Sequence, residues 1–390
     1  MLRNFLSYGS GGMTIDLHPL NVLIGPNASG KSNLIEAISV LRGAAKDLAG
    51  HFRERGGVRE FVRGDEVSPE IAEIEAVVDG PDHASGVPLL HRLHFYSLGV
   101  HLGIFDEEIQ FVPDPDEDIG NFPEPVYDFQ GGNPILNRYV GYKKPWELEH
   151  VEGLKFNQSI LSQRSDPRSY PEVYYLAEEF EQIAIYQEWT FGGRSRARLP
   201  QSADMPSDFL LPDASNLALV VNQLTQRSQM RDKLLGYLKR FYDAAQHITT
   251  KIEGGSVQLY VEESGGRLIP ATRLSDGTLR YLSLLTILCH PTPPPLICIE
   301  EPELGLHPDV VPTIAELLKD ASERTQLVVT THSDALVSAL SDVPESVIVC
   351  ESGSDGTTLR RLDPEKLAAW LEKYTLGDLW RMGEIGGNRW

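Results

Sequence analysis

The sequence predicts an α/β fold with a mixed sheet core, an antiparallel β portion near the N-terminus and an inserted helical lobe. Three patterns support this. An apolar strand precedes a glycine-rich loop at 25–32, helical spacing dominates from about 145 to 250, and apolar strands alternate with helices after 290. Strands that are apolar at every position are typical of parallel sheets covered on both faces.

The first portion of the chain is expected to be rich in strands. The predicted strands are Arg3–Ser7, Thr14–Leu17, Asn21–Ile24, Ile71–Val78 and Arg92–Leu102. A helix is expected over Asn33–Leu41, where Leu34, Ile38 and Leu41 fall on one face. From residue 112 the chain becomes acidic and rich in proline, which indicates an exposed irregular loop.

Residues 112–254 are predicted to form an insertion, the acidic loop followed by a helical lobe, inside a discontinuous domain made of 1–111 and 255–390. Helices are expected over Tyr174–Tyr186 and Asn216–His247, where apolar residues recur at helical spacing. The later strands are expected at Val257–Val261, Leu268–Ile269, Leu296–Ile299, Leu327–Thr330 and Val347–Cys350. The later helices are expected at Thr278–Cys289, Val310–Leu318 and Ala335–Leu340.

Composition indicates an ordinary globular protein of 390 residues, 41% of them hydrophobic. No stretch approaches 18 consecutive apolar residues, and the N-terminus lacks an apolar signal core, so we expect a cytoplasmic protein without a membrane span. The three cysteines, Cys289, Cys298 and Cys350, sit in apolar runs and are expected to be reduced core residues.

The net charge of −21 argues against indiscriminate binding to DNA, because phosphate backbones repel an acidic protein. A local basic face can coexist with an acidic whole, so DNA binding is left open. Two basic groups are candidates for such a face, although a solvated surface or a protein contact explains them better. They are Arg53, Arg55, Arg59 and Arg63, and Arg194, Arg196 and Arg198.

Residues 25–32 read GPNASGKS, the pattern of a phosphate-binding loop. Gly25 and Gly30 allow the backbone to wrap a phosphate group and to point its N–H groups inward at the head of the next helix. Lys31 is placed to reach the β- and γ-phosphates of a nucleotide, and the Ser32 hydroxyl to ligate Mg²⁺. The apolar strand before the loop and the amphipathic helix after it support this interpretation.

The segment LICIEEPE ends an apolar strand in two adjacent acids, Glu300 and Glu301. Such a strand delivers both carboxylates to the carboxyl edge of a sheet, where ligands of α/β folds bind. We expect Glu300 to hold Mg²⁺ through water and Glu301 to orient or deprotonate the attacking water. His332, at the end of the strand LVVTT, is expected to donate a hydrogen bond to the γ-phosphate.

A second anion site is predicted at Ser275–Asp276–Gly277, which opens an apolar helix. The phosphate loop already supplies a cradle for the nucleotide of its own chain. A second site in the same chain makes sense if it caps a nucleotide held by another copy. This predicts a head-to-tail homodimer with two nucleotides buried at its interface.

These motifs resemble those of the SMC/RecF branch of the ABC ATPases, and more closely the OLD-like predicted ATPases of prokaryotes. The similarity is strong over residues 1–45 and 255–340. It implies an ATP-binding head with ATP and Mg²⁺ as cofactors, Walker B acids at Glu300 and Glu301, a trans signature at Ser275 to Gly277 and a switch histidine at His332. The implied nucleotide contacts of the loop are Gly25, Pro26, Asn27, Ala28, Ser29, Gly30, Lys31, Ser32 and Asn33.

The chain also departs from the family pattern. Asp276 stands where transporters carry a second glycine, and Glu300 replaces the usual aspartate. No glutamine lies between Asn33 and Ile109, so the Q-loop residue cannot be assigned, with Gln110 as a candidate. OLD nucleases add a Toprim domain with a DxD pair, and no such pair follows His332.

Relatives of this layout imply a function: an ATP-hydrolysing, ATP-dependent dimeric regulator in prokaryotic anti-phage defence that works with a separate effector, such as a Toprim-type nuclease. One alternative is a RecF-like DNA-repair or chromosome-maintenance ATPase that clamps DNA. A scaffold that holds ATP without turnover is disfavoured by Glu301 and His332. The closing segment 376–387 resembles that of a smaller subgroup, and we expect the tail with Trp370, Trp380, Met382 and Trp390 to dock on the chain's own core.

Overall fold

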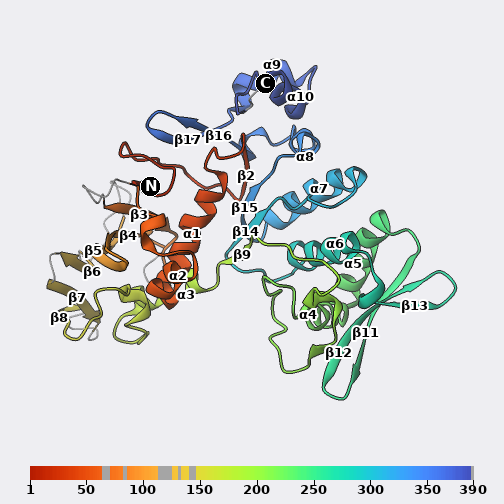
Figure 1. Cartoon of the computed structure of the whole chain (residues 1–390), viewed down its shortest axis with the longest axis horizontal. Helices are drawn as coiled ribbons and strands as arrows, with labels where there is room; N and C mark the ends of the chain where they lie inside the picture. Colours follow the sequence, from red (N-terminus) through yellow and green to blue (C-terminus); the bar gives the residue numbers. More distant parts are fainter. Residues whose placement is uncertain (64–70, 82–85, 113–124, 131–132, 140–145, 388–390) are drawn as a thin grey trace. The chain divides into compact units, whose positions relative to one another are not determined.

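The computed structural model describes residues 1–63, 71–81, 86–112, 125–130, 133–139 and 146–387 (Figure 1). The chain forms two compact units, each built from separate stretches of sequence. Unit 1 comprises Met1–Asp16, Asn27–Ile183 and Cys350–Leu359, and unit 2 comprises Leu17–Pro26, Ala184–Val349 and Arg360–Trp390. The insertion boundaries predicted at 112 and 254 stay a prediction, and most of the acidic stretch lies outside the described residues.

Unit 1 contains a seven-stranded antiparallel sheet in the order β1-β3-β4-β5-β6-β7-β8. Its strands are β1 (Leu2–Arg3), β3 (Ala72–Val78), β4 (Leu89–Leu98), β5 (His101–Phe111), β6 (Tyr127–Gln130), β7 (Asn133–Tyr139) and β8 (Trp146–His150). Along β4 the side chains of Leu93 and Phe95 are buried while Arg92 and His94 are partly exposed. This alternation buries one face of the sheet.

The helices of unit 1 are α1 (Lys31–Lys46), α2 (Leu48–Glu54) and α3 (Pro171–Glu181), with short 3₁₀ turns η1 (Val58–Glu60) and η3 (Ile160–Ser162). Four aromatic rings form the centre of this unit's core. The ring centroid of Phe52 lies 4.8 Å from that of Phe61 and 5.0 Å from that of Phe95. The ring of Phe5 also contacts Phe61 and Phe95. The buried rings bring together the N-terminus, α2 and the sheet.

Unit 2 is built on parallel strands in the order β16-β2-β15-β14-β9. They are β16 (Val347–Gly353), β2 (Leu20–Ile24), β15 (Gln326–Thr330), β14 (Leu296–Glu300) and β9 (Ala184–Tyr186). The strand β16 is followed by its hairpin partner β17 (Gly356–Arg361), and Cys350–Leu359 of this hairpin are counted with unit 1. Every residue of β2 is buried, as expected for a parallel sheet covered on both faces.

A second sheet of unit 2 has β10 (Gln201–Ser202), β12 (Ser256–Glu263) and β11 (Ala245–Glu253) in that order, with β13 (Arg267–Pro270) paired to β12. The helices are α4 (Leu217–Thr225), α5 (Ser228–Phe241), α6 (Asp276–Leu288), α7 (Val311–Ser322), α8 (Asp334–Ser338), α9 (Pro364–Leu371) and α10 (Leu376–Met382). The short 3₁₀ turns are η4 (Arg196–Arg198), η5 (Ala271–Arg273), η6 (Pro308–Val310) and η7 (Pro344–Ser346).

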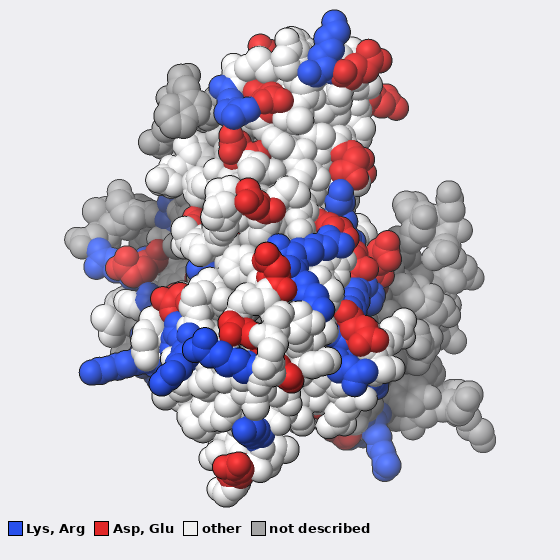
Figure 2. Space-filling model, turned by 90° about the vertical axis from the view of Figure 1, so that its right-hand side faces the viewer, with Lys and Arg blue, Asp and Glu red and all other residues white. Residues whose placement is uncertain are grey.

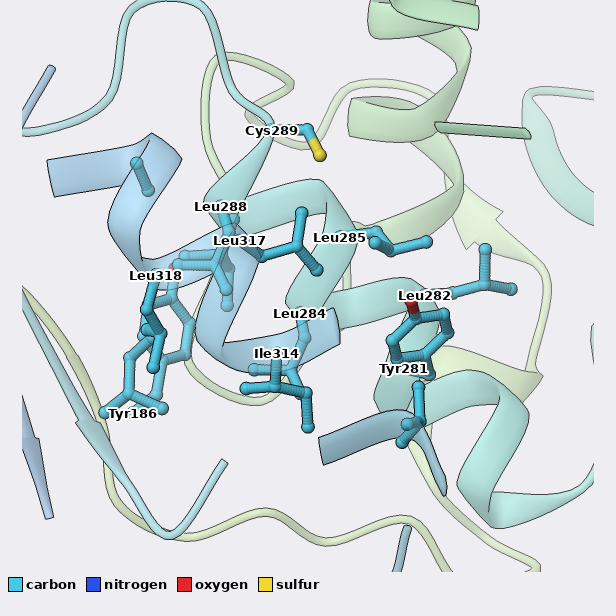
Figure 3. Close-up of a cluster of buried hydrophobic side chains, with 14 of the residues drawn as sticks. Tyr186, Tyr281, Leu282, Leu284, Leu285, Leu288, Cys289, Ile314, Leu317 and Leu318 are labelled. Carbon is cyan, nitrogen blue, oxygen red and sulfur yellow. The ribbon is translucent and has the colours of Figure 1, made fainter. Parts of the chain in front are cut away.

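Helix α6 is buried on nearly all sides, and this explains its almost continuous apolar sequence. Figure 3 shows Leu284, Leu285 and Leu288 of this helix beside Ile314 and Leu317 of α7. Among the helices of the described residues, none combines the length and apolar character needed to cross a bilayer.

The predicted fold class is confirmed, including the antiparallel portion near the N-terminus and the loop-to-helix order after β2. The three cysteines are buried and unpaired, as predicted. In the tail, Trp380 is buried as predicted, whereas Trp370 and Met382 are 42% and 48% exposed. Trp390 lies outside the described residues.

Five predicted elements were wrong in extent or type. The predicted strand Arg3–Ser7 shortens because Asn4 and Leu6 take left-handed backbone conformations, and Thr14–Leu17 forms no strand. The predicted strand Arg92–Leu102 is two strands, β4 and β5, joined at Gly99, whose φ is 63°. Gly99 permits this tight turn.

The other two corrections concern predicted helices that end early. The pattern over Tyr174–Tyr186 ends as a helix at Glu181, because Ala184–Tyr186 pairs with β14 as β9. The pattern over Asn216–His247 splits into α4 and α5, and Ala245 already belongs to β11. In both places pairing within a sheet outweighs local helical spacing.

Candidate functional site

In unit 1 the predicted phosphate loop leads into α1, whose N-cap is Gly30 with φ 97°. As a glycine, Gly30 provides no side-chain cap to α1, and the first turn of the helix carries no acid. Lys31 is buried and Ser32 is exposed at this helix start. Ala28 also has a positive φ, of 60°. An uncapped helix N-terminus attracts anions, so this geometry fits a phosphate group.

The loop is held from behind by residues that are distant in sequence. The Thr357 hydroxyl donates to the Ser29 carbonyl at 3.0 Å, and the Tyr8 hydroxyl donates to the Gly30 carbonyl at 3.2 Å. Ser7 Oγ lies 2.6 Å from Thr357 Oγ1 and accepts from Asn33 Nδ2 at 2.6 Å. Burial raises the pKa of Tyr8, which therefore stays a neutral donor. These bonds fix the loop's carbonyls on the side away from its N–H groups.

In unit 2 the acid pair lies where β14 ends. Glu300 is the last strand residue, and its carbonyl accepts from the Trp189 indole at 3.1 Å. Glu301 has a positive φ of 44°, unusual for a residue with a side chain. Its N–H donates to the Thr330 carbonyl at 3.0 Å. The chain thus turns sharply at Glu301 while remaining joined to β15.

The Glu301 carbonyl is bound by Arg280 of α6 at 3.1 Å and by the Leu304 N–H at 3.0 Å. The Arg280 guanidinium also lies over the Trp189 ring, 5.2 Å from its centroid. Burial lowers the pKa of Arg280, while Glu303 and Glu301 oppose that shift. Arg280 therefore ties the helix that begins with the predicted signature to the backbone of Glu301.

The predicted switch residue His332 follows β15 and lies beside the acid pair. Its Nε2 is 3.7 Å from Glu301 Oε1, and both side chains are more than a third exposed. The His332 N–H donates to Glu303 Oε1 at 3.3 Å, and the Thr331 hydroxyl donates to the same oxygen. Burial raises the pKa of Glu303, and these two hydrogen bonds counteract the shift.

The predicted signature opens α6, and its side chains have local partners. Ser275 caps the helix by accepting from the Thr278 N–H at 3.0 Å, and both it and Asp276 are exposed. Asp276 pairs with Arg198, whose buried guanidinium also donates to the Ala271 and Leu274 carbonyls. Arg198 therefore braces the signature, and this corrects its placement in a surface basic group.

Three neighbouring parallel strands of unit 2 end at one edge of the sheet. There β2 ends in Gly25 and Pro26, β15 in Thr331 and His332, and β14 in Glu300 and Glu301. The Thr331 N–H donates to the Leu23 carbonyl, which confirms that the β2 and β15 ends are level. Unit 2 thus brings Glu301 and His332 together, while Asn27 to Asn33, Lys31 among them, belong to unit 1.

Several residues of this arrangement were missed from the sequence. Glu303 had a signal, since it is the third acid of the EEPE segment. Tyr8, Thr357 and Trp189 had none, because they reach the motifs only through long-range packing.

Comparison with known proteins identifies a family and a fold. The family model described as "AAA domain, putative AbiEii toxin, Type IV TA system" matches residues 20–131 and 198–338. No curated protein matches the sequence.

Solved structures of SMC heads have a similar fold. An SMC head bound to the C-terminal winged-helix domain of ScpA aligns with TM-score 0.56 and 13% identity, covering 94% of this chain and 98% of that one. The Smc head of Pyrococcus furiosus, with an extended coiled coil and bound to the C-terminal domain of ScpA, aligns with TM-score 0.54 and 13% identity. This alignment covers 95% of this chain and 97% of that one. The Smc head of Pyrococcus yayanosii, with a coiled coil and joint, aligns with TM-score 0.50 and 12% identity, and the alignment covers 95% of this chain and 98% of that one. At these identities the likeness concerns the fold, and it confirms the predicted fold of an SMC-type head.

Proposed function

Since the chain belongs to this AAA-domain family, we propose that it is a Mg²⁺-dependent ATPase that dimerises around ATP. The observation that carries the proposal is the level ending of β2, β15 and β14, which gathers Gly25, His332 and Glu301 at one sheet edge. Ligands of α/β folds bind at such an edge. The uncapped start of α1 supplies the phosphate-binding end that an ATPase requires.

The residues fit ATP and Mg²⁺ in separate roles. Lys31 and the N–H groups at the start of α1 would hold phosphate, and Ser32 and Glu300 would hold the metal. Bound Mg²⁺ would neutralise charge on the phosphates. Glu301, partly exposed beside His332, is the carboxylate suited to orient water, because burial does not hide it.

The Glu301→Gln variant tests this assignment against wild type and Lys31→Ala. We expect Glu301→Gln to bind ATP normally, because the lost carboxylate activates water and does not contribute to affinity. Its kcat should fall about a hundredfold or more, the usual effect of losing a general base. Phosphate release and equilibrium binding of a fluorescent ATP analogue measure the two quantities. Wild-type phosphate release no higher than that of Lys31→Ala would refute ATP hydrolysis.

The exposed signature supports an ATP-dependent dimer. Ser275 and Asp276 lie on the surface of unit 2 at the N-terminus of α6, where a partner's nucleotide could reach them. The N-terminal end of a 13-residue helix favours an anion. In Glu301→Gln, saturating ATP should trap the dimer, and light scattering after size exclusion measures this. A monomer under those conditions would contradict the proposal.

For the biological role we infer an ATP-gated regulator in prokaryotic anti-phage defence that acts with a separate effector, such as a nuclease. The toxin–antitoxin term in the family's description supports a role beside a toxic partner. Affinity purification of the Glu301→Gln variant from its native host, with and without ATP, tests this. A partner retained only with ATP is the expected result, and recovery of the bare homodimer in both conditions would count against it.

A second candidate function, clamping DNA, is favoured by the distribution of charge. Residues 184–290 carry twelve Lys and Arg against ten Asp and Glu, although the whole chain has a net charge of −21. Figure 2 shows Lys and Arg side chains gathered in the middle and lower part of one face, with acids among them. Clamping requires ATP-dependent duplex binding that weakens steeply with salt, which fluorescence anisotropy would measure. No binding at low salt would exclude it.

A further inference from the structure

Glu303 has no role in the proposed reaction, yet its carboxylate lies within the site. Its Oε1 accepts from the Thr331 hydroxyl and from the His332 N–H, the latter at 3.3 Å. Thr331 Oγ1 in turn accepts from the Ser333 N–H at 2.9 Å. A single carboxylate oxygen therefore holds Thr331 and His332 directly, and Ser333 indirectly through the Thr331 hydroxyl.

The other oxygen of Glu303 indicates that this carboxylate has a structural role and not a catalytic one. Oε2 is buried and makes no hydrogen bond within the described residues. The Glu301 carboxylate, by contrast, is 37% exposed and faces His332. A buried oxygen cannot receive a proton from water in the site as an exposed one can. The charged groups that act on Glu303 are Glu301 and Arg280, while His332 contacts it through the backbone N–H.

The consequence for His332 follows from the backbone. Its imidazole lies 3.7 Å from Glu301 Oε1, and the backbone conformation of residues 331–333 contributes to that placement. Glu301 and Glu303 lie in one turn, where the Leu304 N–H donates to the Glu301 carbonyl. Glu303 therefore joins the turn that carries Glu301 to the segment that carries His332.

We propose that Glu303 is a positioning residue that keeps His332 in register with Glu301. The expected effect of Glu303 on catalysis rests on the proposed ATPase function, whereas its effect on the conformation of residues 331–333 does not. The acceptor oxygen is what matters, and the negative charge is not required. Glutamine can present an amide oxygen where Oε1 lies, whereas leucine has a similar size and no acceptor.

The test compares Glu303→Gln with Glu303→Leu. In Glu303→Leu we expect kcat to fall about a hundredfold with the KM for ATP changed less than about twofold, because the catalytic groups are misplaced while the phosphate loop is intact. Glu303→Gln should keep kcat within about threefold of wild type, unlike Glu301→Gln. A fall in kcat as large in Glu303→Gln as in Glu303→Leu would overturn the positioning role.

Amide hydrogen exchange gives a readout that needs no turnover. The His332 amide should exchange about tenfold faster or more in Glu303→Leu and close to the wild-type rate in Glu303→Gln, since one loses the acceptor and the other keeps it. Unchanged exchange in Glu303→Leu would refute the proposal even if wild type hydrolyses ATP. If wild type does not hydrolyse ATP, the proposed function fails and the exchange rates still decide the role of Glu303. If Glu303→Leu does not fold, Thr331→Val replaces it in these measurements, because it removes the hydroxyl that donates to Glu303 Oε1.

Discussion

At the scale of single residues, the site depends on backbone conformations that most side chains avoid. Glu301 has a φ of 44°, and a non-glycine residue in such a conformation carries strain of about 1–3 kcal/mol. Its backbone is held there by hydrogen bonds with the Thr330 carbonyl, the Leu304 N–H and the Arg280 guanidinium. The strain is thus offset by the surrounding fold, and the carboxylate is aimed by the backbone before any ligand binds.

Gly30 allows a direct test of such a conformation. A Cβ added there would lie 2.2 Å from Thr357 Oγ1, and the φ of 97° disfavours any side chain. Gly57 is a matched control, because its φ is 103° and a Cβ would contact nothing within 4 Å. We expect Gly57→Ala to lower the free energy of unfolding by about 1 kcal/mol and Gly30→Ala by about 2–4 kcal/mol, the excess reflecting the clash. Urea unfolding measures both, and equal losses would show that Thr357 moves away without cost.

At the scale of elements, strongly patterned segments were predictable and boundaries set by pairing were not. The strand Asn21–Ile24 and the helix Thr278–Cys289 could be predicted, because their apolar patterns reflect burial on every side. The end of α3 could not, because β9 forms only by pairing with β14, more than 100 residues away. The turn at Gly99 was also missed, since the end of β4 and the start of β5 were read as one strand, Arg92–Leu102.

Because α10 packs closely on α8, we expect a side chain at Gly377 to lower stability. A Cβ on Gly377 would lie 2.3 Å from the Asp334 carbonyl oxygen, which is backbone and cannot move aside easily. Gly236, exposed in α5 with nothing within 4 Å of an added Cβ, is the control. Gly377→Ala should destabilise unit 2 by about 1–3 kcal/mol or detach the tail, and Gly236→Ala should stabilise by up to about 1 kcal/mol. Thermal unfolding with limited proteolysis of the tail measures both; an intact, equally stable Gly377→Ala would contradict tight docking.

At the scale of the whole molecule, the motifs could be read from the sequence, but the supports that hold them could not. Glu301 and His332 were predicted because their residue types at two strand ends indicate one site. Their supports, such as Arg280 and Trp189, come from other elements and show no local pattern. Arg198 was even assigned to the surface, because a sequence shows its charge but not the carbonyls that surround it.

The proposed dimer predicts that two inactive variants restore each other. In Lys31→Ala the phosphate loop is defective, and in Ser275→Arg the defect lies in the signature offered to the partner. A mixed dimer would contain one site with both defects and one site with none, because each site combines one chain's loop with the other chain's signature. Random pairing of equal amounts should therefore recover about a quarter of wild-type phosphate release. Ser275 also caps α6 through the Thr278 N–H, so circular dichroism must first show that Ser275→Arg is folded. No recovery from two folded variants that exchange subunits would mean that each chain completes its own site.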